Sequence, residues 1–258
     1  MDEAWIRAIV ALPFGLVVGS FMTVAVYRLP RGESVVRPRS RCPGCGAEIG
    51  ARDNIPVLSW LLLRGKCRRC GERISAEYPL LELTTAGLVV LAAVRYPNPW
   101  HAVLVGGLLS LMPGVALIDL RHRIIPNKLT YPALIVFAVL ILLAWLIGDA
   151  ADPVKAVLGL LLYGGILFIV AAVSRGMGMG DVKLAAVIGL VFGSLGLRFV
   201  GVAAAAAIVL GGLGAVGALA MGRGRKSAIP FGPYLAAGAV VAGLWGEPLA
   251  SWYIGRFL

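Results

Sequence analysis

The sequence predicts an all-α polytopic membrane protein with about eight transmembrane helices and a small polar domain between the first two. Hydrophobic residues make up 59% of the 258 residues and charged residues only 14%, whereas soluble domains contain about 25% charged residues. Apolar runs of about 20 residues, enough to span a bilayer, recur along the chain. Segment 28–79 instead gathers charges and all four cysteines. This composition argues against a soluble globular protein and against a disordered chain.

The apolar runs define the predicted spans in order along the chain. These spans are 5–27, 79–95, 101–119, 129–147, 154–174, 182–198, 199–221 and 231–254. The sixth and seventh run together around Leu197–Phe199, so the turn between them must be very short. Gly211, Gly214 and Gly217 lie within the seventh span and predict close helix packing through small residues.

The distribution of Lys and Arg predicts the orientation of these spans. Segments 28–79, 120–128, 175–183 and 222–230 together hold 19 of the 24 Lys and Arg, and the other side of the alternation holds 5. Because Lys and Arg concentrate in cytoplasmic loops, segment 28–79 is predicted to be cytoplasmic and both termini to lie outside. The net charge of +11 is therefore a topology signal, and no nucleic-acid partner is expected.

The four cysteines form two paired motifs, Cys42-x2-Cys45 and Cys67-x2-Cys70, each followed by a glycine. Two such knuckles supply four thiolates in the tetrahedral arrangement that suits a structural zinc ion. A catalytic zinc is disfavoured because four thiolates close the coordination sphere. Disulfides and unligated thiols are the alternatives, and a reducing cytoplasm disfavours disulfides.

Two aspartates lie at the ends of predicted spans. Asp119 ends the third span and Asp181 begins the sixth, so both are expected at the cytoplasmic interface. Two carboxylates held close cannot both ionise easily, and the pair can then divide base and acid roles as in aspartic proteases. The alternative is structural: Asp119 would pair with Arg121 or Arg123, and Asp181 would pair with Lys183 or cap its helix.

Glycines before the second aspartate favour the functional interpretation. Three of the five residues in Gly176–Gly180 are glycine, which predicts unwound backbone beside a cavity, where a substrate strand could pair. The two histidines, His101 and His122, are predicted on opposite membrane faces. That placement disfavours a histidine-based dyad or metal site.

Eight sequence blocks occur in order along the chain: Gly19–Pro30, Cys42–Cys45, Asp53–Trp60, Arg64–Cys70, Ile74–Glu82, Ile118–Asn127, Gly178–Leu184 (G-M-G-D-V-K-L) and Ile229–Ala236 (I-P-F-G-P-Y-L-A). Taken together, they resemble the bacterial type IV prepilin peptidases, which are membrane aspartic proteases of the GxGD type. Departures from the family pattern are small: Thr23 stands where Asn is common, and Asn127 where Asp is common.

The resemblance implies a bifunctional enzyme of the inner membrane with Asp119 and Asp181 as its catalytic residues. Such enzymes remove the basic leader of type IV prepilins and pseudopilins after a glycine. They then methylate the new N-terminal residue with S-adenosylmethionine. The resemblance assigns no residues here to this methyl donor.

The expected organisation is a first helix over 1–27, a zinc domain within the methyltransferase module over 28–79, and a seven-helix peptidase core over 80–258. Lipids and pilin precursors are the expected partners. The alternatives are a peptidase without methyltransferase activity, which the four-cysteine domain disfavours, and a transporter or zinc-stabilised receptor. Acids at span ends and the lack of a visible repeat disfavour the transporter.

Overall fold

The computed structural model describes residues 3–148, 150–174, 177–222 and 230–257, and the protein is mainly helical. Helices make up 78% of it, and within the described ranges no sheet forms, although two isolated β-bridges occur near the cysteines. The helices are α1 (Glu3–Arg28), α2 (Leu58–Leu62), α3 (Glu77–Arg95), α4 (Pro99–His122), α5 (Asn127–Gly148), α6 (Pro153–Ser174), α7 (Met179–Leu195), α8 (Leu197–Ala220) and α9 (Gly232–Phe257), with short 3-10 turns η1 (Leu29–Arg31) and η2 (Ala51–Asp53).

Each of the eight predicted spans corresponds to one long helix, in the expected order. Six of them, α1, α3, α4, α5, α6 and α8, are long and apolar enough to cross a membrane. The other two, α7 and α9, do not meet that criterion: α7 has 17 residues, and α9 contains Glu247 and an internal Pro248. The all-α membrane fold is therefore confirmed, while α7 and α9 are too short or too polar to be counted as membrane spans by themselves.

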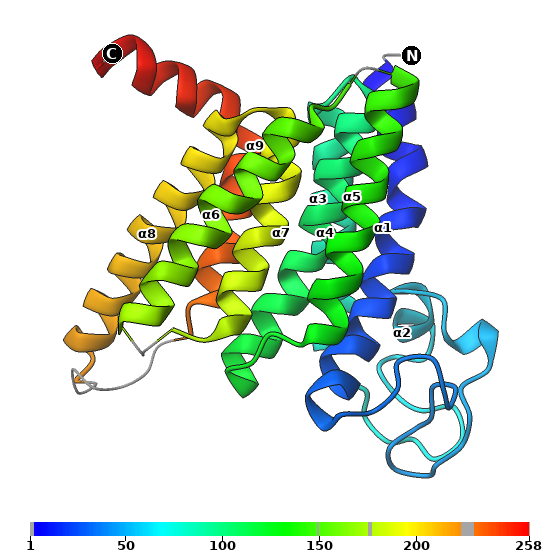
Figure 1. The fold of residues 1–258 in the computed structure, drawn as a ribbon. Helices are drawn as coiled ribbons and strands as arrows, with labels where there is room; N and C mark the ends of the chain where they lie inside the picture. Colours follow the sequence, from blue (N-terminus) through cyan, green and yellow to red (C-terminus); the bar gives the residue numbers. More distant parts are fainter. Residues whose placement is uncertain (1–2, 149, 175–176, 223–229, 258) are drawn as a thin grey trace.

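The two chain ends lie at one end of the bundle, and the polar segment 28–79, which is called the insert below, lies at the other (Figure 1). The last turn of α4 and the first turn of α7 also lie at the end that carries the insert. The predicted alternation of the helices is thus present in the structure.

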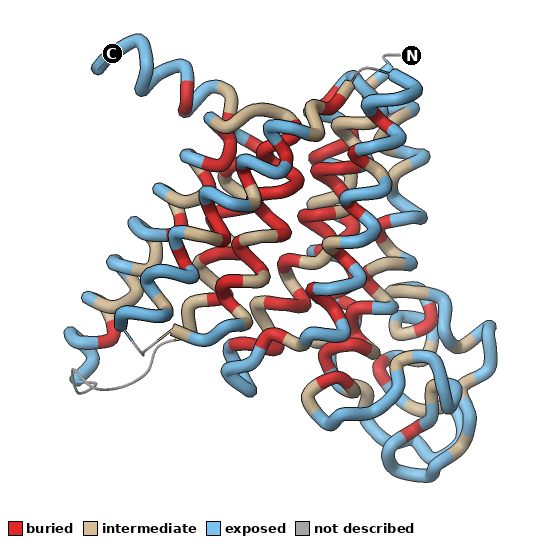
Figure 2. Tube along the Cα trace, viewed as in Figure 1, coloured by how far each residue is buried: buried red, intermediate tan, exposed pale blue. Residues whose placement is uncertain are grey.

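The core of the bundle forms around α7. Twelve of its 17 residues are buried, whereas the most apolar windows of α5, α6 and α8 are only 22% buried. Figure 2 shows buried positions gathered in the middle of the bundle and exposed positions along its outer faces. Exposed apolar side chains on the outer helices are expected to face lipid rather than water.

Small residues allow the helices to approach closely, both at two of the three glycines that the sequence analysis named and at others. A Cβ atom added at Gly189 of α7 would lie 2.3 Å from the Gly159 oxygen of α6, so a larger residue at either position would push these helices apart. In α8, Gly211 and Gly214 make room for the rings of Phe231 and Tyr234, as predicted, but no atom of the described residues lies within 4 Å of a Cβ at Gly217. The packing prediction is therefore wrong for Gly217.

The junction between α7 and α8 is the very short turn that the sequence predicts. The first helix ends at Leu195, the next begins at Leu197, and Gly196 alone separates them. Its φ of 143° is a conformation that residues with a side chain rarely adopt.

Candidate active site and candidate metal centre

Asp119 lies in the last turn of α4 and caps another helix. Its side chain is buried, and its Oδ2 accepts a hydrogen bond of 2.9 Å from the backbone N–H of Gly232. Gly232 is the first residue of α9, where backbone N–H groups have no partner within the helix. The carboxylate therefore satisfies a free donor and lies at the positive end of the α9 dipole.

Asp181 lies in the first turn of α7 and is also buried. Its Oδ1 has no hydrogen-bond partner among the described residues. It lies near enough to Asp119 for the two charges to interact directly, and α4 packs against α7. The structure thus brings together the two aspartates that the sequence analysis selected.

The glycine-rich segment before Asp181 is less unwound than predicted. Helix α7 already begins at Met179, and the backbone N–H of Asp181 donates to the Gly178 oxygen at 3.1 Å. Of the expected unwound stretch, Met177 and Gly178 are non-helical, whereas Gly176 lies outside the described residues. The first turn forms because the helix continues directly into an apolar, buried run.

The sequence analysis offered ion pairs with nearby basic residues as alternative roles for the two aspartates, but Lys183 and Arg121 have other partners. Lys183 Nζ donates to Asn127 Oδ1 at 2.7 Å and lies 5.0 Å from the centre of the Tyr131 ring. Arg121 forms an ion pair with Glu77 of α3. Among the described residues no ion pair joins Asp119 or Asp181 to a basic side chain, Arg123 included.

Two glycines keep space free around the pair. A Cβ atom at Gly232 would lie 2.6 Å from Asp119 Oδ2, and one at Gly180 would lie 3.0 Å from the Cβ of Ile125. Gly232 therefore allows α9 to contact the Asp119 carboxylate, and Gly180 allows the α4–α5 loop to contact α7. The sequence analysis quoted the block containing Gly232 but gave it no role, because only the fold shows which carboxylate it approaches.

The four cysteines form one cluster. Their sulfur atoms all lie within 4.8 Å of one another, and Cys42 Sγ is 3.7 Å from Cys70 Sγ. A tetrahedral site with Zn–S bonds of about 2.3 Å requires S···S separations of about 3.8 Å. The donor set and its spacing therefore fit a zinc ion, as expected, and disulfides do not form.

Each pair of cysteines belongs to a small knuckle with the same hydrogen bonds. Cys42 N donates to the Ala47 oxygen, and Cys67 N donates to the Glu72 oxygen. The glycine after each second cysteine, Gly46 or Gly71, has a φ near 70° (68° and 73°), which a side chain would strain. Backbone N–H groups of Cys70 and Arg69 lower the pKa of the Cys67 thiol to about 6, which favours the thiolate that a metal binds.

A further acid joins the insert to the bundle, and the sequence analysis gave it no role. Glu82 of α3 is buried, and its Oε2 accepts a hydrogen bond of 2.7 Å from the backbone N–H of Val57. Val57 has a φ of 61°, which is rare for a β-branched residue. Strained backbone of this kind persists only where the surroundings impose it, and the Glu82 contact is part of that restraint.

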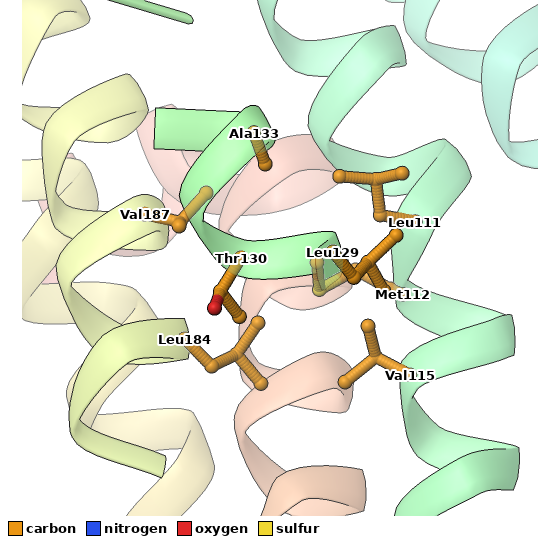
Figure 3. A pocket seen from close by; sticks show the side chains of 8 residues that line it. All are labelled: Leu111, Met112, Val115, Leu129, Thr130, Ala133, Leu184 and Val187. Carbon is orange, nitrogen blue, oxygen red and sulfur yellow. The ribbon is translucent and has the colours of Figure 1, made fainter. Parts of the chain in front are cut away.

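A cavity inside the bundle offers no second site. It has a volume of about 10 Å³ and lies between α4, α5 and α7 (Figure 3). Its lining is apolar apart from the Thr130 hydroxyl, and such a small apolar space is a packing void. The lining residues are Leu111, Met112, Val115, Leu129, Thr130, Ala133, Leu184 and Val187.

Comparisons with known proteins agree with this fold and site. Residues 13–96 match the family model described as bacterial peptidase A24 N-terminal domain, and residues 102–216 match the type IV leader peptidase family. A prepilin leader peptidase/N-methyltransferase of Bacillus subtilis (strain 168) is 37% identical over 93% of this chain and 95% of its own. A protein of the same name from Aeromonas hydrophila is 34% identical over 98% of this chain and 96% of its own. No solved structure matches.

The fold and the site define a polytopic α-helical membrane protein with a candidate two-aspartate active site and a candidate zinc centre at one end. The matches cover nearly the whole chain. The chain belongs to the type IV leader peptidase family.

Proposed function

We propose that this protein cleaves the leader peptide from type IV prepilins and related secretion proteins after a glycine, and then N-methylates the new N-terminal residue. Its family and the shared name of its relatives support both activities. The observation that supports the proteolytic step is that α4 packs against α7, so that Asp119 in the last turn of α4 and Asp181 in the first turn of α7 lie near each other at one end of the bundle.

The two aspartates are proposed to divide the chemistry of peptide hydrolysis. One ionised carboxylate accepts a proton from water, and the water oxygen attacks the scissile carbonyl carbon. The protonated partner donates its proton to the carbonyl oxygen, giving a tetrahedral diol. Collapse of the diol breaks the C–N bond, and the proton returns to the leaving amine. The N-terminus of α9 holds the Asp119 carboxylate in place through Gly232.

The active site is proposed to face the cytoplasm at the inner membrane. Segments 28–79, 120–128, 175–183 and 222–230 hold 19 of the 24 Lys and Arg, which is the arrangement of cytoplasmic loops. A prepilin has a basic leader followed by an apolar helix, so its cleavage site lies at this interface. The buried pair lies at the same end of the bundle and can reach it.

Residues 28–79 are proposed to form a zinc-stabilised part of the methyltransferase module. Cys42, Cys45, Cys67 and Cys70 would hold the ion, which would stabilise a domain too small to have a sufficient core of its own. S-adenosylmethionine would supply the methyl group. An exposed arginine of the insert would suit the carboxylate of this methyl donor, although Arg68 is already paired with Asp53 at 2.8 Å.

The test of the dyad is a pair of isosteric substitutions. Asp119→Asn and Asp181→Asn should each abolish leader removal from a prepilin in nanodiscs, because an amide cannot transfer the proton. Asp152→Asn is the matched control, since the Asp152 carboxylate binds Lys155 Nζ at 2.9 Å and the Lys155 backbone N–H at 3.0 Å at the start of α6, and asparagine can still accept the backbone hydrogen bond. Methylation of a precleaved peptide should survive both dyad substitutions, and normal leader removal by either variant would exclude that residue as catalytic.

The same assay separates the bifunctional enzyme from a peptidase alone. A bifunctional enzyme incorporates labelled methyl groups into the precleaved peptide, whereas a peptidase alone does not. The match of residues 13–96 to the N-terminal domain model, which contains the four cysteines, supports the bifunctional reading.

A further inference from the structure

The insert is polar on average, but it contains one apolar segment. Residues 55–63 read I-P-V-L-S-W-L-L-L within a domain rich in arginine. Leu58, Leu61 and Leu62 are 48%, 58% and 71% exposed, and Ile55 is 46% exposed. A small soluble domain would place such leucines in its core, so their common exposure requires a partner.

The segment is held firmly, so exposure of the leucines does not reflect a loose loop. Ser59 Oγ donates to the Arg52 oxygen at 3.0 Å and accepts from Ile55 N at 2.9 Å. Trp60 Nε1 donates to the Ile74 oxygen at 3.0 Å. These polar contacts fix one face of α2 to the rest of the insert, and the leucines point away from it.

The depth of this segment follows from its bond to α3. Val57 N binds Glu82, which lies one helical turn, about 6 Å, beyond Tyr78 towards the middle of α3. Tyr78 and Tyr27 are both half-exposed at the insert-bearing ends of α3 and α1, where tyrosines mark the membrane interface. In Figure 1, α2 lies at the level of the lower turns of α1 rather than below them.

The charges beside the leucines match a lipid surface. Arg64 and Lys66 directly follow the apolar segment, Arg52 precedes it, and all three are exposed. Apolar side chains flanked by cations are typical of segments that lie in the membrane interface. Cations at this level attract anionic headgroups of the cytoplasmic leaflet.

We propose that residues 55–66 form an interfacial membrane anchor, with Leu58, Leu61 and Leu62 among lipid acyl chains and Arg64 and Lys66 at anionic headgroups. The anchor and the Glu82 bond hold the insert at a fixed height beside α1 and α3. This inference rests on the membrane fold and the exposed leucines and does not depend on the proposed catalytic activities.

The anchor can be tested by quenching in the full-length protein. A fluorescent amino acid is placed at position 62, or at position 39, where the side chain is 84% exposed in the same insert. In phosphatidylglycerol nanodiscs, brominated acyl chains should quench position 62 several-fold more than position 39, and aqueous iodide should do the reverse. Iodide quenching of both positions alike, without quenching by brominated lipid, would overturn the anchor.

Two further arms identify the occupant. Arg64→Gln with Lys66→Gln should reduce the brominated-lipid quenching in phosphatidylglycerol but not in phosphatidylcholine, in samples that retain zinc. If the double variant lost zinc, the comparison of quenching at positions 62 and 39 would still decide the question, because it needs neither substitution. If position 62 were shielded from both quenchers only after prepilin was added, the leucines would bind substrate, and the lipid anchor would be wrong.

Discussion

Replacing Gly232 by alanine perturbs the candidate active site by one methyl group. Its backbone N–H binds Asp119 Oδ2, and an added Cβ would lie 2.6 Å from that oxygen and 3.0 Å from Asp119 Cγ. Favourable contacts between carbon atoms begin near 3.5 Å, so the carboxylate or the start of α9 must move by about 0.5 Å. Gly232 does not have a positive φ, so alanine introduces this displacement without backbone strain.

The size of the effect follows from that displacement. A misplacement of about 1 Å at a reacting group can cost about 100-fold in rate. We expect Gly232→Ala to lower kcat for leader removal by about 10- to 100-fold, which is about 1.4–2.7 kcal/mol in the activation barrier. The KM for prepilin should change little, because the added methyl group contacts Asp119 and not a surface assigned to substrate binding.

The assay is leader removal from a purified prepilin in nanodiscs, followed by the change in mass. Gly217→Ala in α8 is the control, because a Cβ there meets no atom within 4 Å. Methylation of a precleaved peptide should be unchanged in both variants. Wild-type kcat in Gly232→Ala would refute the idea that close contact with α9 positions the Asp119 carboxylate. An equal loss in Gly217→Ala would attribute the effect to helix packing in general.

Three further predictions concern the insert. Cys42→Ser should reduce zinc from about one ion per chain and expose residues 28–79 to protease, measured by metal analysis and limited proteolysis. Glu82→Ala should destabilise the insert by about 1–3 kcal/mol because Val57 N loses its acceptor, whereas Glu82→Gln keeps an acceptor and should unfold like wild type. The Arg68 guanidinium lowers the pKa of the Asp53 carboxyl. Their pairing therefore stabilises the insert at pH values above the ordinary aspartate pKa, and this stabilisation is lost as the pH falls through the lowered pKa. Arg68→Gln should raise the Asp53 pKa, measured by a carbon-13 NMR titration.

The sequence was sufficient to predict the helices and to place both aspartates at one end of the bundle, because both follow from differences in polarity between neighbouring segments. Apolar runs of membrane length are visible residue by residue, and a charged residue at the edge of such a run is conspicuous. The paired cysteine motifs are local as well, and each one folds into its own knuckle. The alternation of spans alone then places Asp119 and Asp181 at one end of the bundle, in the last turn of α4 and the first turn of α7.

The sequence did not reveal contacts that depend on how distant segments meet. Glu82 ends one of the recognised sequence blocks, but its bond to Val57 depends on the path of the insert back towards α3. Gly232 lies in a recognised block, yet its contact with Asp119 exists only because α9 begins beside the end of α4. The sequence analysis did not single out the exposed leucines of α2 for a different reason. The average composition of residues 28–79 is polar, whereas one nine-residue segment within it is apolar.

The helices that build the candidate active site are those that depend most on their neighbours. Helix α7 carries Asp181, and α9 supplies the N–H that binds Asp119, but neither is long and apolar enough to be counted among the six membrane-capable helices. Helix α6 packs against α7, and α8 packs against α9, so each of these more apolar helices covers one side of its neighbour. Glycine, alanine and polar residues can therefore occupy α7 and α9 near the aspartates without facing the bilayer. The site is assembled by tertiary packing, which explains why one methyl group at Gly232 is expected to disturb it while Gly217, on the lipid-facing α8, can be changed freely.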